Sequence, residues 1–252
     1  QTNQQWEDNR KQFVEIYKEH LPHNLKTEIR FENKVVNLKT TPKVSVIIPT
    51  KGNIDLLSQC VTSIIEKDDY PNIEILIADT GSEEGEINQI KELINSHKET
   101  TKIRLIEYDY YNFAKINNDV VRNHVSEDTE LLLLSNNDIK VLNNAISQMV
   151  EVYIKNKKNI GTIGARLHFE DNTIQHAGMI SWINRNRGIE ISHNGLRSYY
   201  NYERNPKIIG NTAAFLLINK DLFNNIGGFN QVYIECFEDV ELNMECLNRN
   251  KE

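Results

Sequence analysis

The sequence predicts an α/β fold with a central, mostly parallel sheet flanked by helices. Short apolar runs rich in Val, Ile and Leu alternate with longer segments in which apolar residues recur every three or four positions. The short runs are typical of strands buried on both faces, and the periodic segments are typical of helices. Their alternation favours parallel strands joined by right-handed crossovers.

The regular alternation begins at Val44 and continues to about residue 153. We expect strands at 44–48, 73–78, 103–106 and 131–134. We expect helices over 54–65, 87–94, 113–121 and 146–153, where the apolar residues have helical spacing. Pro49 ends the first strand because it has no N–H for a continuing ladder.

The second half of the chain is less regular. We expect strands over 160–167, 173–182 and 212–218, and a short helix that starts at 221 and stops at the two glycines 227–228. Residues 183–206 are predicted to be an exposed, mobile loop. A final helix has Val240, Met244 and Leu247 as its apolar stripe. Glu238 and Asp239 start that helix, where its positive dipole end stabilises anions.

The first 43 residues differ from the rest and are predicted to form an N-terminal helix and linker. Residues 5–19 have apolar side chains among charges, which is typical of an amphipathic helix. Residues 44–252 then form the main domain. The chain begins at Gln1 rather than Met and ends in a charged, helix-like run. We therefore expect a fragment of a longer protein whose C-terminal part is missing.

Composition excludes several classes of protein. The 252 residues include 29 basic and 36 acidic side chains, and the net charge of −7 argues against a nucleic-acid binder. No window is apolar enough for a membrane helix, and no signal-peptide pattern opens the chain. The three cysteines are an odd number without C-x-x-C spacing, which predicts a reduced, cytoplasmic setting and no zinc site. A position at the membrane periphery is the alternative location.

Polar residues end the leucine strand at 131–134 abruptly. Ser135, Asn136, Asn137 and Asp138 follow it. Open α/β sheets bind ligands just past the carboxyl ends of their strands. A carboxylate at that place can hold a hard divalent cation, and the cation can hold a diphosphate. The alternative is an ordinary Asn/Asp turn.

Asp79 ends the second strand and is followed by Thr-Gly-Ser. It is either an Asx-turn or helix-capping residue, or a carboxylate that accepts hydrogen bonds from a nucleotide base or ribose. Pro49 and Thr50 would lie beside it and offer backbone groups to the base. No strand is followed by G-x-G-x-x-G or by a Walker A sequence, so neither a dinucleotide fingerprint nor a P-loop is expected.

Three further polar groups have both a structural and a functional interpretation. Lys115 lies in the first turn of the third helix, where it is either solvated or near a phosphate. The pair Glu238 and Asp239 is either a charge bias at a helix start or the source of a general base, whose pKa neighbouring acids would raise. His176 is a ligand or base, or a structural histidine.

Taken in order, these segments resemble family 2 of the glycosyltransferases, which have the GT-A fold. The resemblance covers roughly residues 43–247. The matching segments are VSVIIPT (44–50), ILIADTGS (75–82), NFAKINN (112–118), LLLSNND (132–138), GARL (164–167), TIQHAG (173–178), GGF (227–229) and FEDVEL (237–242). Each is short, and their order and spacing carry the assignment.

The resemblance implies an inverting hexosyltransferase of the bacterial surface-glycan type. Such an enzyme transfers a sugar from a nucleotide-diphosphate donor, with a UDP-sugar as the first expectation, to a hydroxyl of a glycan or glycoconjugate. The implied donor-binding residues are Pro49, Thr50, Asp79, Lys115, Asn118 and Asn137, with Asp79 at the base.

The same resemblance assigns the metal and the proton acceptor. Asp138 would ligate Mg²⁺ or Mn²⁺ bridging the diphosphate, and Asp239 would be the catalytic base, with Glu238 second. Two departures from the family stand out. Asn136 replaces the first acid of the Asp-x-Asp motif, and no residue up to Glu252 supplies the metal-contacting histidine that often follows the acidic pair.

Two other functions are alternatives to a transferase. A catalytically weak sugar-nucleotide-binding scaffold domain of a larger transferase is the main alternative, because Asn136 removes a charge from the metal motif. A nucleotidyltransferase shares a related fold but needs a Gly-rich loop with a downstream basic residue, which residues 51–53 do not supply. Besides donor and acceptor, the expected partners are further domains of a longer chain or a second copy of this one.

Overall fold

The computed structural model describes residues 8, 9, 11, 12, 15, 16, 31–68, 70–185, 188–196, 208–234 and 236–251. The six described positions between 8 and 16 are helical, and the rest of the helix predicted for 5–19 lies outside the described residues. Within the described part of the chain, no helix has the length and apolar character needed to cross a membrane.

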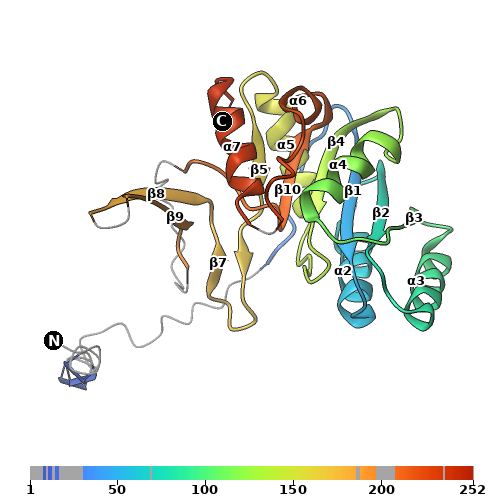
Figure 1. Ribbon diagram of the computed structural model, residues 1–252, viewed down its shortest axis with the longest axis horizontal. Helices are drawn as coiled ribbons and strands as arrows, with labels where there is room; N and C mark the ends of the chain where they lie inside the picture. The colour runs from blue at the N-terminus through green and yellow to red at the C-terminus, as the bar shows by residue number, and fades with distance from the viewer. Residues whose placement is uncertain are drawn as a thin grey trace.

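A six-stranded sheet forms the centre of the molecule (Figure 1). Its strands, in spatial order, are β3 (Lys102–Glu107), β2 (Ile73–Asp79), β1 (Lys43–Thr50), β4 (Thr129–Ser135), β10 (Phe215–Asn219) and β5 (Thr162–Gly164). The first four are mutually parallel, and β10 runs antiparallel to both of its neighbours. The predicted α/β fold with a mostly parallel sheet is confirmed, with β10 as the exception.

Helices cover both faces of the sheet. One face packs against α2 (Ile54–Lys67), α3 (Glu84–His97) and α5 (Ala145–Asn156), and the other against α4 (Phe113–Asn123), α6 (Lys220–Ile226) and α7 (Glu238–Asn248). In β4, Leu131 and Leu133 enter the first core, whereas Leu132 and Leu134 enter the second. Because both faces are buried there, the four central positions of this strand, 131–134, are all apolar.

The strands of the second half are shorter than the sequence predicts. The predicted strand over 160–167 is β5 and β6 (Leu167–His168), and that over 173–182 is β7 (Ile174–His176) and β8 (Met179–Asn184). Gly178 lies between β7 and β8 at φ +92°. This left-handed conformation, which glycine adopts readily, interrupts the extended chain.

Part of the loop predicted for 183–206 is instead a strand. β9 (Gly188–His193) pairs antiparallel with β8, and Ile183 lies opposite Ile189. Arg185 lies in the turn between them, so the polar composition that suggested a loop belongs in part to a hairpin turn. The hairpin projects to the left of the sheet in Figure 1. Residues 186, 187 and 197–206 of the predicted loop lie outside the described residues.

The buried face of α7 differs from the predicted apolar stripe. Leu242, Asn243 and Cys246 are buried, whereas Leu247 is 38% exposed. The prediction was wrong because a hydrogen-bonded asparagine occupies the packed face. Hydrophobic periodicity cannot identify such a residue, since it counts only apolar side chains.

Candidate active site

The carboxyl ends of β2, β1 and β4 form one edge of the sheet, and the predicted donor-site residues follow them. Asp79 ends β2, Thr50 ends β1 directly after Pro49, and the polar motif follows β4. Thr50 and Asp79 are register partners. Asn137 Nδ2 donates to Thr50 Oγ1 at 2.9 Å. The structure thus brings these strand ends together at one edge.

The Asp79 carboxylate holds the turn that follows its own strand. Its Oδ2 accepts the N–H groups of Gly81 and Ser82, each at 3.0 Å, and its Oδ1 accepts the Ser82 hydroxyl. The Ser82 Oγ in turn accepts the Gly52 N–H at 2.7 Å, which joins the turns after β1 and β2. A carboxylate offers about four acceptor positions, so these bonds leave capacity for another donor. The contact between Asp79 and a base stays a prediction.

The segment that leads from β3 into α4 lies next to this turn. The Tyr108 N–H donates to the Asp79 carbonyl at 2.8 Å. Asn112 caps the helix, because its Oδ1 accepts the Lys115 N–H at 2.7 Å. The Lys115 side chain is exposed, and its Nζ lies over the Tyr110 ring, 4.1 Å from the centroid. This cation–π contact keeps the ammonium close to the surface of α4.

Asn118 faces the loop that follows α6 rather than open space. Its Nδ2 donates to the Phe229 carbonyl at 2.7 Å, and its Oδ1 accepts the Phe229 N–H at 2.8 Å. A Cβ on Gly228 would lie 2.3 Å from the Asn118 Oδ1, so only glycine fits there. The structure gives this buried amide a role in holding the loop, and its contact with the donor stays a prediction.

Asp138 is an exposed carboxylate just beyond β4. The backbone before it is anchored at Asn136, whose N–H donates to the Ala214 carbonyl at 3.0 Å and whose carbonyl accepts the Cys60 thiol at 3.5 Å. Burial raises the pKa of the Cys60 thiol to about 12, so the thiol keeps its proton. Among the described residues, no group of three or more His, Cys, Asp or Glu side chains could hold a metal ion. A cation at Asp138 would need further ligands from phosphate and water, which Mg²⁺ commonly uses.

Asp239 reaches the same edge from the start of α7. Its Oδ2 accepts the Ala213 N–H at 3.1 Å. The next residue, Ala214, is the one that accepts the Asn136 N–H. The Ala213 N–H and the Ala214 carbonyl, on two consecutive residues, therefore connect the predicted base to the predicted metal motif. Asp239 is partly buried, and Glu238 beside it is 8% exposed.

The two residues before α7 have an uncommon backbone conformation. Cys236 and Phe237 lie at φ 76° and 72°, in the left-handed region. This region costs a residue with a Cβ roughly 1–2 kcal/mol. Such strain is concentrated at functional sites. Here it turns the chain directly into Glu238 and Asp239.

His176, at the end of β7, contacts the protein through both ring nitrogens. It is 1% exposed, and burial, followed by the neighbouring His193, lowers its pKa to about 4. Its Nε2 accepts the Thr212 N–H at 3.2 Å, and its Nδ1 lies 2.7 Å from the His193 Nδ1. Both ring nitrogens are engaged in the protein, so the structural interpretation fits this geometry.

Sequence reasoning missed a buried polar cluster behind Asp239. Asn243 Oδ1 accepts the Thr162 hydroxyl at 2.6 Å and the Asn211 N–H at 3.1 Å. Its Nδ2 donates to the carbonyls of Asn211 at 2.8 Å and Asp239 at 2.6 Å. The available signal was a polar residue four positions after Asp239, which places both on one helical face.

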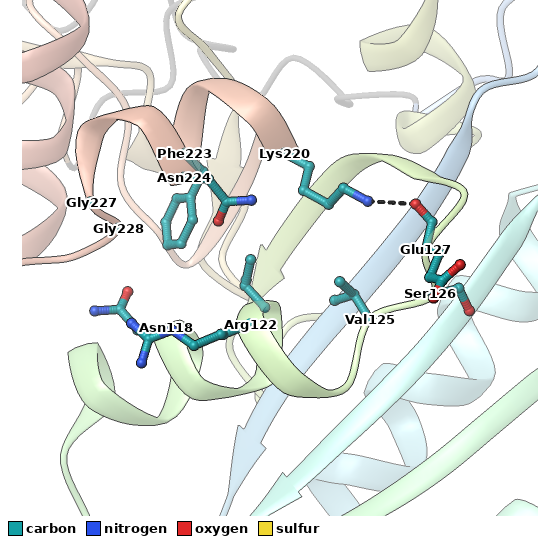
Figure 2. A pocket seen from close by; sticks show the side chains of 11 residues that line it. Asn118, Arg122, Val125, Ser126, Glu127, Lys220, Phe223, Asn224, Gly227 and Gly228 are labelled. Atoms are coloured by element: carbon teal, nitrogen blue, oxygen red, sulfur yellow. Dashed lines mark hydrogen bonds between the residues drawn. The ribbon is translucent and has the colours of Figure 1, made fainter.

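A cavity of about 490 Å³ lies elsewhere, between α4 and α6 (Figure 2). Its lining residues are Asn118, Val121, Arg122, Val125, Ser126, Glu127, Lys220, Phe223, Asn224, Gly227 and Gly228. Three of them immediately precede β4, so the cavity reaches the amino ends of the parallel strands. Because ligands of such sheets bind at the carboxyl ends, we expect the active site at the opposite edge.

A parallel sheet with helices on both faces and acidic groups at its carboxyl edge is the arrangement of the GT-A glycosyltransferases. The model of the Glycosyl transferase family 2 matches residues 45–227, and the chain belongs to this family.

Two curated relatives align with most of this chain. It is 28% identical over 213 residues to the uncharacterized protein y4gI of Sinorhizobium fredii (strain NBRC 101917 / NGR234). It is 26% identical over 212 residues to the O-antigen biosynthesis protein RfbC of Myxococcus xanthus. The alignments cover 81% and 82% of this chain but only 22% and 16% of the relatives. The chain thus spans less than a quarter of their lengths.

A solved structure with the same fold is the mannosyltransferase PcManGT from Pyrobaculum calidifontis, in complex with GDP-Man and Mn²⁺. The TM-score is 0.63 at 15% identity, and the alignment covers 91% of this chain and 58% of that chain. At this identity the similarity shows the fold, and it confirms the GT-A prediction.

Proposed function

We propose that this chain is the catalytic domain of an inverting hexosyltransferase, which moves a sugar from a nucleoside diphosphate to a hydroxyl of a glycan or glycoconjugate. The observation that carries the proposal is the junction of Asn136, Ala213, Ala214 and Asp239 at one edge of the sheet. RfbC is an O-antigen biosynthesis protein, which supports a surface polysaccharide as the acceptor.

The proposed donor lies along the edge from β2 to β10. The strands follow in the order β2, β1, β4, β10, and neighbouring strands are about 4.8 Å apart, so the outer two are separated by roughly 14 Å. This span suits an extended nucleotide sugar. The nucleoside meets Pro49, Thr50 and Asp79, the diphosphate lies near Asn137, Asp138 and Lys115, and the sugar lies before Asp239.

Asp239 accepts the proton of the acceptor hydroxyl. The hydroxyl oxygen attacks the anomeric carbon on the face opposite the diphosphate, and a new C–O bond forms while the bond to the diphosphate oxygen breaks. The diphosphate leaves with the bonding electron pair, and the configuration inverts. The Ala213 N–H engages Oδ2, so the proton goes to Oδ1. Glu238 is the second candidate for this role.

The residues after β4 fit a cation shared with the substrate. When bound at Asp138, Mg²⁺ or Mn²⁺ would neutralise the charge that builds on the departing diphosphate. One exposed carboxylate, phosphate oxygens and water satisfy such a hard cation. Because Asn136 adds no charge, we expect weak cation binding without the donor. PcManGT was solved with Mn²⁺ and a nucleotide sugar, which supports this use of a metal.

Turnover of isotope-labelled UDP-sugars and GDP-sugars by wild type and Asp239→Asn tests the proposal. General-base catalysis contributes about 10²–10⁴-fold, so we expect Asp239→Asn to lose on the order of 10³-fold in kcat with donor affinity unchanged. Glu238→Gln is the matched variant and should lose less kcat than Asp239→Asn. Equal product from wild type and Asp239→Asn would refute the base assignment. UDP is the nucleotide we propose, and the panel includes GDP because PcManGT was solved with GDP-Man.

The role of Asp138 is tested by measuring the affinity for UDP with Mn²⁺ by calorimetry, with and without removal of the metal. Loss of the carboxylate–cation–diphosphate contact should cost about 1.4 kcal/mol or more, so we expect at least a tenfold fall in UDP affinity with EDTA or Asp138→Ala. Asp221→Ala, an exposed acid at the start of α6, is the control and should not change it. Unchanged affinity in both EDTA and Asp138→Ala would reject the metal assignment.

The alternative function is a sugar-nucleotide-binding scaffold domain of a larger transferase. It is favoured by Asn136, which leaves Asp138 without a second acid in the motif. Binding of UDP with Mn²⁺ but no turnover of any sugar nucleotide by wild type would establish it. The lengths of the relatives support further domains as partners, and the cytoplasmic location stays a prediction from the cysteine pattern.

A further inference from the structure

We propose that His176 and Asn243 are positioning residues, which hold the backbone at 211–213 so that the Ala213 N–H meets Asp239. The inference rests on the proposed function, in which Asp239 is the base. Neither side chain touches the reacting atoms. Both act through the backbone segment that supplies the hydrogen bond to the carboxylate.

Asn243 holds this segment from the side of α7. It is 2% exposed, and its amide makes four hydrogen bonds, two as acceptor and two as donor. It bonds to the N–H and to the carbonyl of Asn211, and also to the carbonyl of Asp239. Asn243 therefore bonds directly to Asp239, and it holds Asn211, which lies two residues before Ala213.

Two glycines allow this close approach. A Cβ on Gly210 would lie 2.4 Å from the Asn243 Cγ, and a Cβ on Gly164 would lie 2.5 Å from the Asn211 Oδ1. Real Cβ atoms do not approach other atoms so closely. The backbone at Gly210 thus lies against the Asn243 amide, and that at Gly164 against the Asn211 amide, at distances that a larger residue would prevent.

His176 holds the same segment from the side of β7. The Thr212 N–H can only donate, so the Nε2 that faces it at 3.2 Å carries a lone pair. The proton of the neutral ring is then on Nδ1, which donates to the His193 Nδ1 at 2.7 Å. The second histidine thereby fixes the tautomer that lets the first accept from Thr212.

Asn243 and His176, the two anchors of this segment, bind consecutive residues. Asn243 binds Asn211, His176 binds Thr212, and the next N–H along the chain belongs to Ala213, which donates to Asp239. A displacement of about 1 Å at a reacting group can cost 10²-fold in rate. Loosening either anchor should therefore lower kcat while leaving the nucleotide site at β1 and β2 intact.

Two substitutions of His176 separate positioning from packing. A glutamine can place its amide oxygen where Nε2 lies and accept from Thr212, whereas an asparagine reaches only the place of Nδ1. We expect His176→Asn to lose roughly 30-fold or more in kcat, His176→Gln to stay within about threefold of wild type, and UDP affinity to stay within about twofold in both. His97→Asn on α3 is the matched control and should leave kcat unchanged.

Hydrogen exchange at the Ala213 amide gives a readout that needs no turnover. Asn243→Asp keeps the two accepted bonds and loses the two donated ones, so we expect faster exchange there, as in His176→Asn. Equal kcat losses in His176→Gln and His176→Asn, or wild-type exchange in both His176→Asn and Asn243→Asp, would overturn the proposal. Faster exchange together with full turnover by Asp239→Asn would instead reject the base and leave the two anchors established.

Discussion

The two halves of the active-site edge are organised by different kinds of contact. In the nucleotide half, Asp79 accepts hydrogen bonds from residues two and three positions later in the chain. In the base half, Asp239 meets Ala213 across 26 residues, and Asn243 meets Thr162 across 81. The first half is built from local turns at the ends of parallel strands, and two hydrogen bonds join neighbouring turns. The second depends on the complete tertiary fold, so a change there should affect a larger part of the molecule.

A buried carboxylate also anchors the nucleotide half at the other end of β2, where it joins segments far apart in the sequence. Glu74 is fully buried, and its carboxylate accepts the Ser45 hydroxyl at 2.7 Å, the Ser126 N–H at 2.8 Å and the Ser126 hydroxyl at 2.7 Å. Burial raises the pKa of the Glu74 carboxyl, but these hydrogen bonds outweigh it and lower the pKa from 4.5 to about 2.

The largest expected effect comes from Glu74→Gln, which should cost about 3 kcal/mol of unfolding free energy at pH 7. Since the folded pKa lies below the unfolded one, this contribution is present above pH 4.5 and is lost as the pH falls toward 2. The wild type should therefore lose more stability than the variant in that window, with UDP affinity unchanged at pH 7. Denaturant unfolding from pH 7 to pH 3 measures this. Parallel curves for the two proteins would contradict it.

The contact between α4 and the loop after α6 joins the two halves, and Gly228→Ala should break it. The new Cβ would lie 2.3 Å from the Asn118 Oδ1 in a residue at φ +75°, so we expect a loss of about 2–3 kcal/mol. Gly227→Ala is the matched control, because its φ is +99° but no atom lies within 4 Å of the added Cβ. It should lose only about 1 kcal/mol. Equal losses in thermal unfolding would show that the overlap with Asn118 is unimportant.

The smallest effect should come from Ser82→Ala, which removes a local bond to Asp79 and one bond to Gly52 in the neighbouring turn. We expect a loss of about 1 kcal/mol of stability and a weaker affinity for UDP. Ser96→Ala, at an exposed serine with a local bond of 2.7 Å to the Leu93 carbonyl, should stay within about 0.5 kcal/mol of wild type. If Ser82→Ala lowers the free energy of unfolding as much as Gly228→Ala does, the proposed difference between the nucleotide half and the base half is wrong.

The same contrast explains how much of the fold the sequence could predict. Strands β1 to β4 and helices α2 to α5 were predicted because buried parallel strands are apolar throughout and their crossover helices have clear periodicity. The second half has strands of two or three residues, such as β6 and β7, which are too short for any period to appear. The β8–β9 hairpin was missed because its exposed strands lack the alternation of a half-buried pair.

The candidate site divides in the same way. Asp79 and Asp138 could be located at one edge because Asp79 ends one apolar strand and Asp138 lies three residues after another. The Ala213 N–H could not be identified, since every residue except proline has such a group and only the tertiary fold selects one. Asn243 was overlooked because a buried asparagine lies outside any apolar pattern until its partners are known. His176 was recognised as a polar residue of interest, but its bond to Thr212 depends on a segment 36 residues away.

The exposure of Cys236, just before α7, has a practical consequence for spectroscopy. Cys60 and Cys246 are buried, and burial raises the pKa of their thiols to about 12 and about 11, so they form little reactive thiolate. Cys236 is exposed and lies three residues before Asp239. A maleimide fluorophore should therefore attach at this one position of the natural sequence, which puts an optical probe at the entrance to α7 without any engineered cysteine.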